Sequence, residues 1–300
     1  MNTHDDLFLT PGTLRTSLLE RTAHARRCGA IHSIPTTAKV IEQNGVAFQV
    51  RIVATLEKKE AEKAARQKLN PFLPYDPDLF VASISPTHIS LLNKFNVVEH
   101  HLLIVTRTFE DQQTQLTQKD CEALLIALTE IDGLAFYNAG AIAGASQPHK
   151  HLQLIPLEDP AISPLPIEQL LRFVKMDGAT GTVPGLPFLH AYAPMDRDWT
   201  NPEKDSGASL HACYRALVRA VGFSADATPG THAPTAPYNL LVTRKWLLLV
   251  PRSQESFEGM SINALGFAGA FLVKDLSQLE ILRKEGPMTA LQRVSLPPKE

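Results

Sequence analysis

Residues 144–156 of this 300-residue chain are Gly-Ala-Ser-Gln-Pro-His-Lys-His-Leu-Gln-Leu-Ile-Pro. Polar and apolar side chains alternate through much of residues 149–155, which predicts a β-strand with one face against a hydrophobic core. Side chains two positions apart share a face of a strand, so His149, His151 and Gln153 are expected to project together. The two leucines that alternate with them are expected to point the other way, into the core.

A loop of small residues, 139–146, precedes this strand. Such loops let backbone N–H groups approach an anion closely, and Ser146 and Gln147 add side-chain donors. A histidine has a reference pKa of about 6.5, is substantially neutral near pH 7, and can act as a nucleophile that forms a covalent adduct. This segment therefore offers both an anion-binding loop and a candidate nucleophile.

Two other interpretations of the strand stay open on the residues alone. An H-x-H pair is also a common metal-ligand arrangement, as in cupin-like barrels. Such a site needs a carboxylate a few residues on, and Glu158 is poorly placed because it follows Pro156. The second interpretation is a polar strand with a purely structural role.

The flanking sequence predicts alternating strands and helices. Residues 117–131 predict a helix, with Thr117 as N-cap and Asp120 as a partial capping box. The three prolines in residues 70–77 exclude regular structure and indicate an ordered connection anchored by its aromatic residues. A first helix with Gly29 after its end is expected near the N-terminus, with Leu14, Leu18, Leu19 and Ala23 on one face. Strands are expected at residues 46–56, 88–94, 101–107 and 134–138.

The proline-rich segment 156–166 is the best candidate boundary between two halves. We expect an N-terminal half at residues 1–160, a linker at 161–186 and a C-terminal half at 187–300. A hairpin is predicted at residues 238–250, turning at 243–245. The order of strands, helix and hairpin loosely repeats that of the first half, which hints at an internal duplication.

Composition excludes several classes of protein. The formal net charge of −2 gives no overall basic field, so neither nucleic acid nor an anionic membrane is an expected partner. The three cysteines are widely spaced, without a C-x-x-C motif, which argues against a disulfide framework or a zinc ribbon. The N-terminus is acidic, and no apolar run approaches the roughly 18 residues of a membrane span. We therefore expect a cytoplasmic protein.

Three blocks of the sequence together resemble the diadenosine tetraphosphate phosphorylases (ATP adenylyltransferases), in the transferase branch of the histidine-triad superfamily. The resemblance covers most of residues 45–290 in the family's order. It implies an α+β, histidine-triad-like fold with antiparallel sheets flanked by helices and two related halves. The blocks are residues 91–98, then 136–153 with its H-x-H-x-Q motif, then 238–269 in three pieces (238–246, 250–253 and 263–269).

The resemblance also implies roles for individual residues. His151, the second histidine of the motif, corresponds to the nucleophile, and Gln153 to the residue that contacts the attacked phosphate; His149 is grouped with them as catalytic. Lys59 corresponds to an early binding lysine, with Lys58 as its rival. The other implied substrate-binding residues are Asn93, Lys94, Asn138, Gly144, Ala145, Ser146, Gln147, Asn263, Ala264, Leu265 and Lys274. Ala270 departs from the family, which can carry a larger residue there.

The implied reaction is the reversible cleavage of diadenosine tetraphosphate (Ap4A) by inorganic phosphate to ATP and ADP, through an adenylyl-histidine. A divalent cation such as Mg²⁺ is expected with the nucleotide, and no bound organic cofactor. Glutamine at position 153 is typical of the transferase branch, whereas histidine is typical of the hydrolases. The alternatives are a dinucleoside polyphosphate hydrolase, a nucleotidyltransferase for other donors, a non-enzymatic nucleotide sensor and a metal-dependent β-barrel enzyme. Base preference, physiological direction and the choice between monomer and homo-oligomer stay open.

Overall fold

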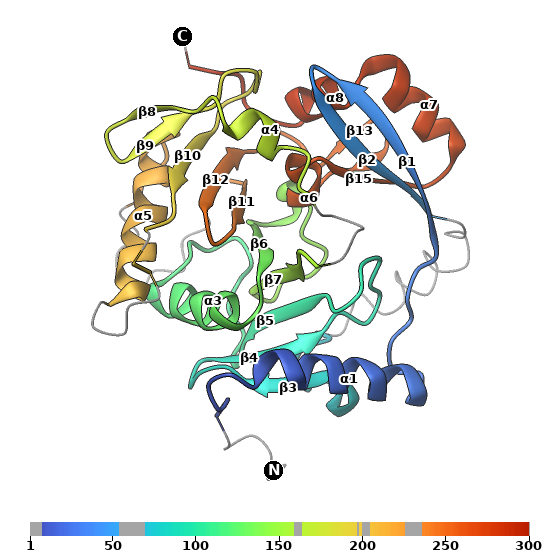
Figure 1. Ribbon diagram of the computed structural model, residues 1–300, viewed down its shortest axis with the longest axis vertical. Helices are drawn as coiled ribbons and strands as arrows, with labels where there is room; N and C mark the ends of the chain where they lie inside the picture. The colour runs from blue at the N-terminus through green and yellow to red at the C-terminus, as the bar shows by residue number, and fades with distance from the viewer. Residues whose placement is uncertain are drawn as a thin grey trace.

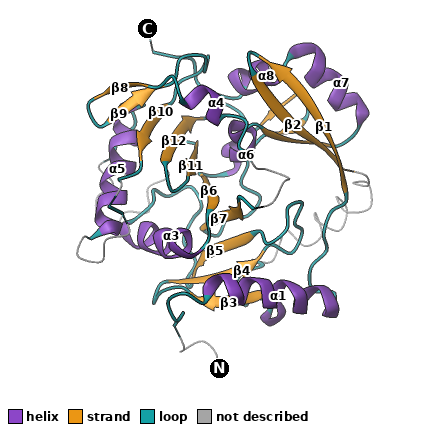
Figure 2. Ribbon diagram, in the orientation of Figure 1, coloured by secondary structure: helices purple, strands orange, loops and turns teal. Residues whose placement is uncertain are grey.

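The computed structural model describes residues 8–53, 70–158, 164–196, 198–199, 205–225 and 236–299. A ten-stranded antiparallel sheet runs through the whole molecule, in the order β3-β4-β5-β7-β6-β11-β12-β10-β9-β8 (Figures 1 and 2). Its strands are β3 Phe80–Ser83, β4 His88–Leu92, β5 Leu102–Thr106, β6 Gly133–Asn138, β7 His151–Pro156, β8 Lys175–Asp177, β9 Thr180–Thr182, β10 Ala191–Pro194, β11 Tyr238–Val242 and β12 Trp246–Pro251.

This sheet contains the same topology twice. In each half three strands precede a helix and two strands follow it, with α3 (Gln118–Glu130) in the first half and α5 (Ser206–Ala220) in the second. Outward from the junction between β6 and β11, the order is β6-β7-β5-β4-β3 on one side and β11-β12-β10-β9-β8 on the other. The duplication suggested by the sequence is therefore present in the fold. The range expected to be a linker carries α4 (Glu168–Leu171), β8 and β9.

The two halves differ at the strand that carries the H-x-H-x-Q motif. Strand β7 corresponds to β12, and both are six residues long and end in proline. His151 at the start of β7 corresponds to Trp246, and Gln153 to Leu248. The second half thus has apolar side chains where the first has the candidate nucleophile and its neighbour.

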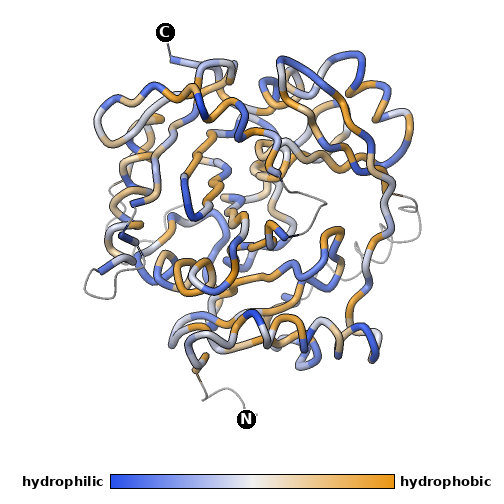
Figure 3. Tube along the Cα trace, viewed as in Figure 1, coloured by the Kyte–Doolittle hydropathy of each residue, from blue (hydrophilic) through white to orange (hydrophobic). Residues whose placement is uncertain are grey.

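Two large hydrophobic cores lie on opposite faces of the large sheet, and a smaller apolar cluster packs Phe72 against β4 and β5. One core lies under α1 (Leu14–Cys28), α3 and α5, and contains Leu152 and Leu154 of β7. The other contains Ile155 and lies under a small sheet, β1-β2-β15, together with α6 and α8. These elements are β1 Thr36–Gln43, β2 Val46–Val53, α6 Ala264–Ala268, β15 Ala270–Val273, α7 Leu276–Glu285 and α8 Pro287–Arg293. In Figure 3 the central strands are mostly coloured as hydrophobic, in keeping with burial on both faces.

Short elements complete the fold. They are η1 Pro77–Leu79, η2 Ala141–Ala143 and the ribbon β13 Ser256–Phe257 with β14 Met260–Ser261. Among the described residues, no helix is long and apolar enough to cross a membrane.

Most of the predicted elements are present, with some corrections. Helix α3 has the complete reciprocal capping box, because Asp120 accepts from the Thr117 backbone while Thr117 accepts from the Asp120 backbone. Helix α1 ends at a left-handed Gly29 as expected, but Leu19 and Ala23 are exposed and Thr22 and Ala25 take their place in the core. The predicted hairpin is β11–β12, whereas β1 and β15 were not predicted.

Candidate active site

The backbone of His151 is held by the side chain of one distant residue. The N–H of His151 donates to Oε1 of Gln112 at 2.7 Å, and Nε2 of Gln112 donates to the His151 carbonyl at 3.1 Å. Gln112 is buried, and its Nε2 also donates to the carbonyl of Asn138 at 2.9 Å. One amide group therefore fixes the start of β7 against the end of β6. The strand was predicted to begin at His149, but β7 begins at His151. At that point the Gln112 amide bridges the carbonyls of His151 and Asn138.

The environment of the His151 ring selects a nucleophilic form. Its Nδ1 lies 2.8 Å from the carbonyl oxygen of His149, which can only accept a hydrogen bond. The proton is therefore on Nδ1, and Nε2 carries a lone pair. Burial lowers the pKa of His151 to about 4, although the bond to the His149 carbonyl partly opposes this shift. The ring is therefore neutral at physiological pH.

Phe72 forms an apolar wall against both histidine rings. Its ring centroid lies 5.3 Å from that of His151 and 5.6 Å from that of His149. Phe72 comes from the proline-rich segment 70–77, so the predicted aromatic anchor is confirmed and sits against the candidate nucleophile. Such a wall excludes water and strengthens electrostatic interactions in the site.

Both ring nitrogens of His149 are used in hydrogen bonds inside the protein. The amide oxygen of Asn70 accepts from the Phe72 N–H, so its Nδ2 donates to Nδ1 of His149 at 2.9 Å. Nε2 of His149 then donates to the carbonyl of Thr106 at 2.9 Å. In this arrangement the Nδ1 lone pair of His149 already accepts a hydrogen bond, and Nε2 carries the proton. Neither nitrogen is free to bind a metal, which disfavours metal ligation by the H-x-H pair. The arrangement suits a role in holding the carbonyl that orients His151.

Gln153 shares the face of β7 with His151, as alternation along the strand predicted. It lies opposite Leu103 of β5 and Phe136 of β6 in the sheet. Its Oε1 is 2.9 Å from Nε2 of His101, a residue that the sequence did not single out.

Asn138, a predicted nucleotide-binding residue, has a fixed amide orientation. Its Oδ1 accepts from the backbone N–H of Ala264 at 3.1 Å and from Nδ2 of Asn239 at 2.8 Å. Arg252 donates in turn to Oδ1 of Asn239 at 2.7 Å. Arg252 is itself buried, so it supports this relay from inside the protein. The NH₂ group of Asn138 is the end of the amide that Asn239 and Ala264 do not hold.

The small-residue loop packs directly on the second half of the chain. A Cβ atom at Gly144, whose φ is +86°, would lie 2.8 Å from Cβ of Asn263, so only glycine fits. The N–H groups of Gly144 and Ala145 close turns onto Ala141 and Gly140. Within residues 144–147, the N–H groups of Ser146 and Gln147 therefore remain as the candidate backbone donors to an anion. Asn263 itself caps α6 by accepting from the Leu265 N–H at 3.0 Å.

The structure describes two of the predicted binding lysines, Lys94 and Lys274. Nζ of Lys94 lies 3.5 Å from a carboxylate oxygen of Asp76, and both side chains are partly exposed. Lys274 is exposed and follows β15. Lys59 and its rival Lys58 lie outside the described residues.

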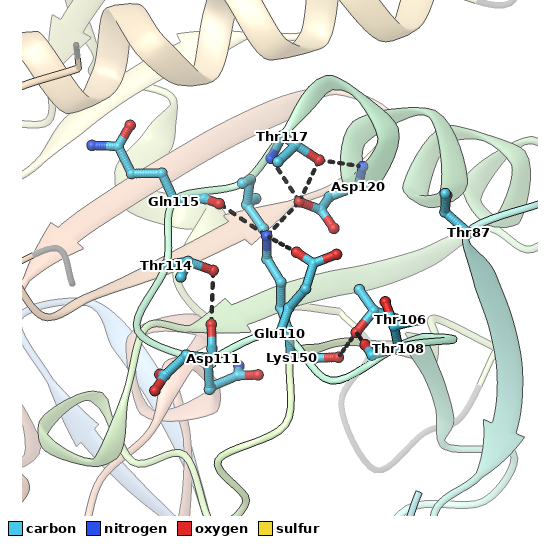
Figure 4. Close-up of polar contacts among 12 residues, drawn as sticks. Thr87, Thr106, Thr108, Glu110, Asp111, Thr114, Gln115, Thr117, Asp120 and Lys150 are labelled. Carbon is cyan, nitrogen blue, oxygen red and sulfur yellow. Dashed lines mark hydrogen bonds and ion pairs between the residues drawn. The ribbon is translucent and has the colours of Figure 1, made fainter. Parts of the chain in front are cut away.

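Lys150, between the two histidines, faces the opposite side of the sheet and is fully buried. Its Nζ lies 2.7 Å from Asp120 at the start of α3, 3.3 Å from Glu110 and 2.9 Å from the Gln115 carbonyl (Figure 4). The other oxygen of Asp120 is 3.0 Å from Nε2 of His88. Burial alone would raise the pKa of Asp120, but the His88 hydrogen bond and the charge of Lys150 hold it well below its usual range.

Comparison with known proteins agrees with this geometry. Residues 4–173 match the Ap4A phosphorylase N-terminal domain, and residues 184–297 match the ATP adenylyltransferase C-terminal domain. Diadenosine 5',5'''-P1,P4-tetraphosphate phosphorylase 2 of Saccharomyces cerevisiae is 33% identical, with 76% of each chain covered. The crystal structure of yeast Ap4A phosphorylase Apa2 superposes with a TM-score of 0.78 at 25% identity, over 97% of both chains.

Apa2 has also been solved in complex with Ap4A, and that structure superposes with a TM-score of 0.77 at 24% identity over 97% of this chain and 100% of that one. A third structure of Apa2 contains AMP. The matched domains, the sequence identity and the shared fold give one conclusion. This chain belongs to the Ap4A phosphorylase family, with the ATP adenylyltransferase domain in its C-terminal half.

Proposed function

We propose that this protein is an ATP adenylyltransferase that cleaves Ap4A with inorganic phosphate to give ATP and ADP, reversibly. The observation that carries this proposal is the state of His151. Its ring is buried and neutral, its Nδ1 proton is committed to the His149 carbonyl, and its Nε2 lone pair is available. This is the form in which an imidazole attacks phosphorus.

The reaction has two displacements. Nε2 of His151 attacks the α-phosphorus of one adenylyl group, the P–O bond to the polyphosphate breaks, and ATP leaves. An oxygen of inorganic phosphate then attacks the phosphorus of the adenylyl-histidine, the P–N bond breaks, and ADP leaves with Nε2 regenerated. The donor groups of Asn138 and Gln153 and the N–H groups of Ser146 and Gln147 would neutralise charge on the phosphates.

The remaining polyphosphate charge is assigned to lysines and to a divalent cation. Lys94, Lys274 and Lys59 are the side chains we propose for the phosphates further from His151. Mg²⁺ would enter with the nucleotide, because it keeps its own waters and prefers phosphate oxygens as ligands. The proposal includes a cytoplasmic location, where these nucleotides and free phosphate are both found.

The pH dependence follows from the lowered pKa of His151. The nucleophile must be unprotonated, so its rate should fall only as the pH drops through about 4. A solvent-exposed histidine would instead lose half of its reactive form near pH 6.5. We expect single-turnover formation of the adduct, measured by rapid quench without phosphate, to be constant within about twofold from pH 5.5 to 8. A rate that halves near pH 6.5 would contradict the buried, neutral ring.

The phosphate requirement tests the function itself. Purified protein is incubated with Ap4A and Mg²⁺, with and without inorganic phosphate, and the products are separated by ion-exchange chromatography. With phosphate we expect ATP and ADP to accumulate in equal amounts over many turnovers; without it, ATP should not exceed one equivalent of the enzyme, and no ADP should form. ATP with AMP, or two ADP, formed without phosphate would identify a hydrolase instead. Binding without turnover in either tube would identify a sensor.

A further inference from the structure

We propose that His101 is a positioning residue that fixes which end of the Gln153 amide faces the reacting phosphate. The proposal deepens the proposed function and rests on it, since the phosphate concerned is the one that His151 attacks. His101 precedes β5 and lies on the same sheet face as Gln153, and its side chain is buried against Phe136.

The orientation of the relay is set by a backbone donor. The N–H of Phe95 donates to Oδ1 of Asn93 at 3.1 Å, and a backbone N–H cannot accept. The other end of that amide, Nδ2, therefore faces Nδ1 of His101 at 3.2 Å and donates to it. Nδ1 must accept, so the single ring proton of a neutral His101 is on Nε2.

That proton determines the orientation of Gln153. Nε2–H of His101 donates to Oε1 of Gln153 at 2.9 Å. The glutamine NH₂ group is then left on the side away from His101. Burial lowers the pKa of His101 to about 4, so the ring is neutral and this pattern holds at physiological pH.

The same arrangement, an asparagine amide that donates to Nδ1 of a histidine, occurs a second time beside the nucleophile. Asn70 accepts from the Phe72 N–H two residues on, and its Nδ2 donates to Nδ1 of His149. In both cases an asparagine amide is oriented by the chain and dictates a histidine tautomer. Two histidines beside β7, His149 and His101, are thus held in the Nε2–H tautomer in the same way.

The consequence for the reaction is electrostatic. An amide that is free to rotate by half a turn presents either a donor or an acceptor with little difference in its own energy. Presented to an anionic phosphate, the carbonyl oxygen repels and the NH₂ group stabilises. Locking the amide removes the unproductive orientation before the transition state forms. Asn93, predicted to bind substrate, takes a structural part in this relay.

The test compares two replacements of His101. His101→Phe keeps a planar ring but provides no donor, and we expect a 10- to 100-fold lower kcat for Ap4A phosphorolysis with KM changed less than about threefold. His101→Gln can place an NH₂ group where Nε2 was, and should recover activity to within about fivefold of wild type. Equal losses in both variants, or none in His101→Phe, would overturn the proposal.

A double-mutant cycle separates positioning from a general structural effect. In a Gln153→Ala background, His101→Phe should cause less than a twofold further loss of kcat, because its target is gone. Losses that multiply would mean that His101 acts by another route. Circular dichroism and thermal melting identify variants that fail to fold.

A spectroscopic measurement decides the matter even if wild type turns out not to cleave Ap4A. Long-range ¹H–¹⁵N correlation of the His101 ring in wild-type protein should show the Nε2–H tautomer. If that tautomer is found but Ap4A is not cleaved, the orientation of Gln153 by His101 is supported and the proposed function is rejected. An Nδ1–H tautomer would overturn the proposed orientation of Gln153 by His101, whether or not Ap4A is cleaved.

Discussion

His151→Ala is expected to lower the rate of adenylyl transfer by at least about 10³-fold, while Ap4A binding weakens by less than about tenfold. The variant lacks the atom that bonds to phosphorus, so no adenylyl intermediate can form. In the proposed site the nucleotide is held by other residues, among them Asn138, Ser146 and Gln147. Phosphorolysis rates and equilibrium binding of Ap4A, measured on the same preparations, give the two quantities.

The covalent adduct supplies the positive evidence. Wild-type protein mixed with Ap4A in the absence of phosphate should gain the mass of one AMP in an intact-protein mass spectrum, and lose it in acid, where a phosphoramidate hydrolyses. His151→Ala should gain nothing. His24→Ala is the matched control, because His24 is a partly exposed histidine of α1 that pairs with Asp78 outside the site. Adduct formation in His151→Ala, or its loss in the control, would contradict the assignment.

The local part of the site could be predicted from the sequence. The period-2 pattern after residue 149 placed His151 and Gln153 on one face of a strand, and the leucines between them lie in the opposite core as expected. The prolines and aromatics of residues 70–77 predicted an anchored connection, and Phe72 supplies the anchor. These features depend on neighbours in the chain, where spacing and backbone preference decide the structure.

The residues that orient the reactive groups could not be found in this way. Gln112 is 39 residues from His151, and His101 is 52 residues from Gln153. Their contacts exist because β5, β7 and β6 pair in one particular register, which periodicity does not specify. Asn239 reaches Asn138 only because the two halves join edge to edge at β6 and β11. Resemblance to the family predicted substrate-binding positions but gave no role to these supporting residues.

Lys150 was given no role by the sequence analysis, although it stands between two candidate site histidines. It lies on the α3 face of the sheet, with no exposed side-chain surface, paired with the equally buried Asp120. The same alternation that puts His151 and Gln153 on one face of the sheet sends Lys150 to the other side. The charge of Lys150 therefore pairs with Asp120 on the α3 face of the sheet, opposite the face that carries His151.

Asp120→Ala is expected to lower the free energy of unfolding by about 3–5 kcal/mol. The substitution leaves the Lys150 ammonium buried without its nearest carboxylate, and it removes a hydrogen-bond partner of His88 and half of the capping box of α3. Urea denaturation followed by circular dichroism measures the change. Glu110→Gln is the matched control. Glu110 is partly exposed and lies 3.3 Å from the same ammonium, so its loss should cost less than about 1 kcal/mol.

Removing both charges distinguishes an uncompensated ion from the loss of packing. Replacing a buried pair by apolar residues of similar size is often nearly neutral, so Asp120→Leu combined with Lys150→Met should recover much of the stability lost in Asp120→Ala. Destabilisation in the double variant as large as the sum of the single changes would contradict this account. Activity need not recover with stability. The pair ties the start of α3 to Lys150, the residue before His151, and a refilled core without that tie would leave the backbone next to the nucleophile with one support fewer.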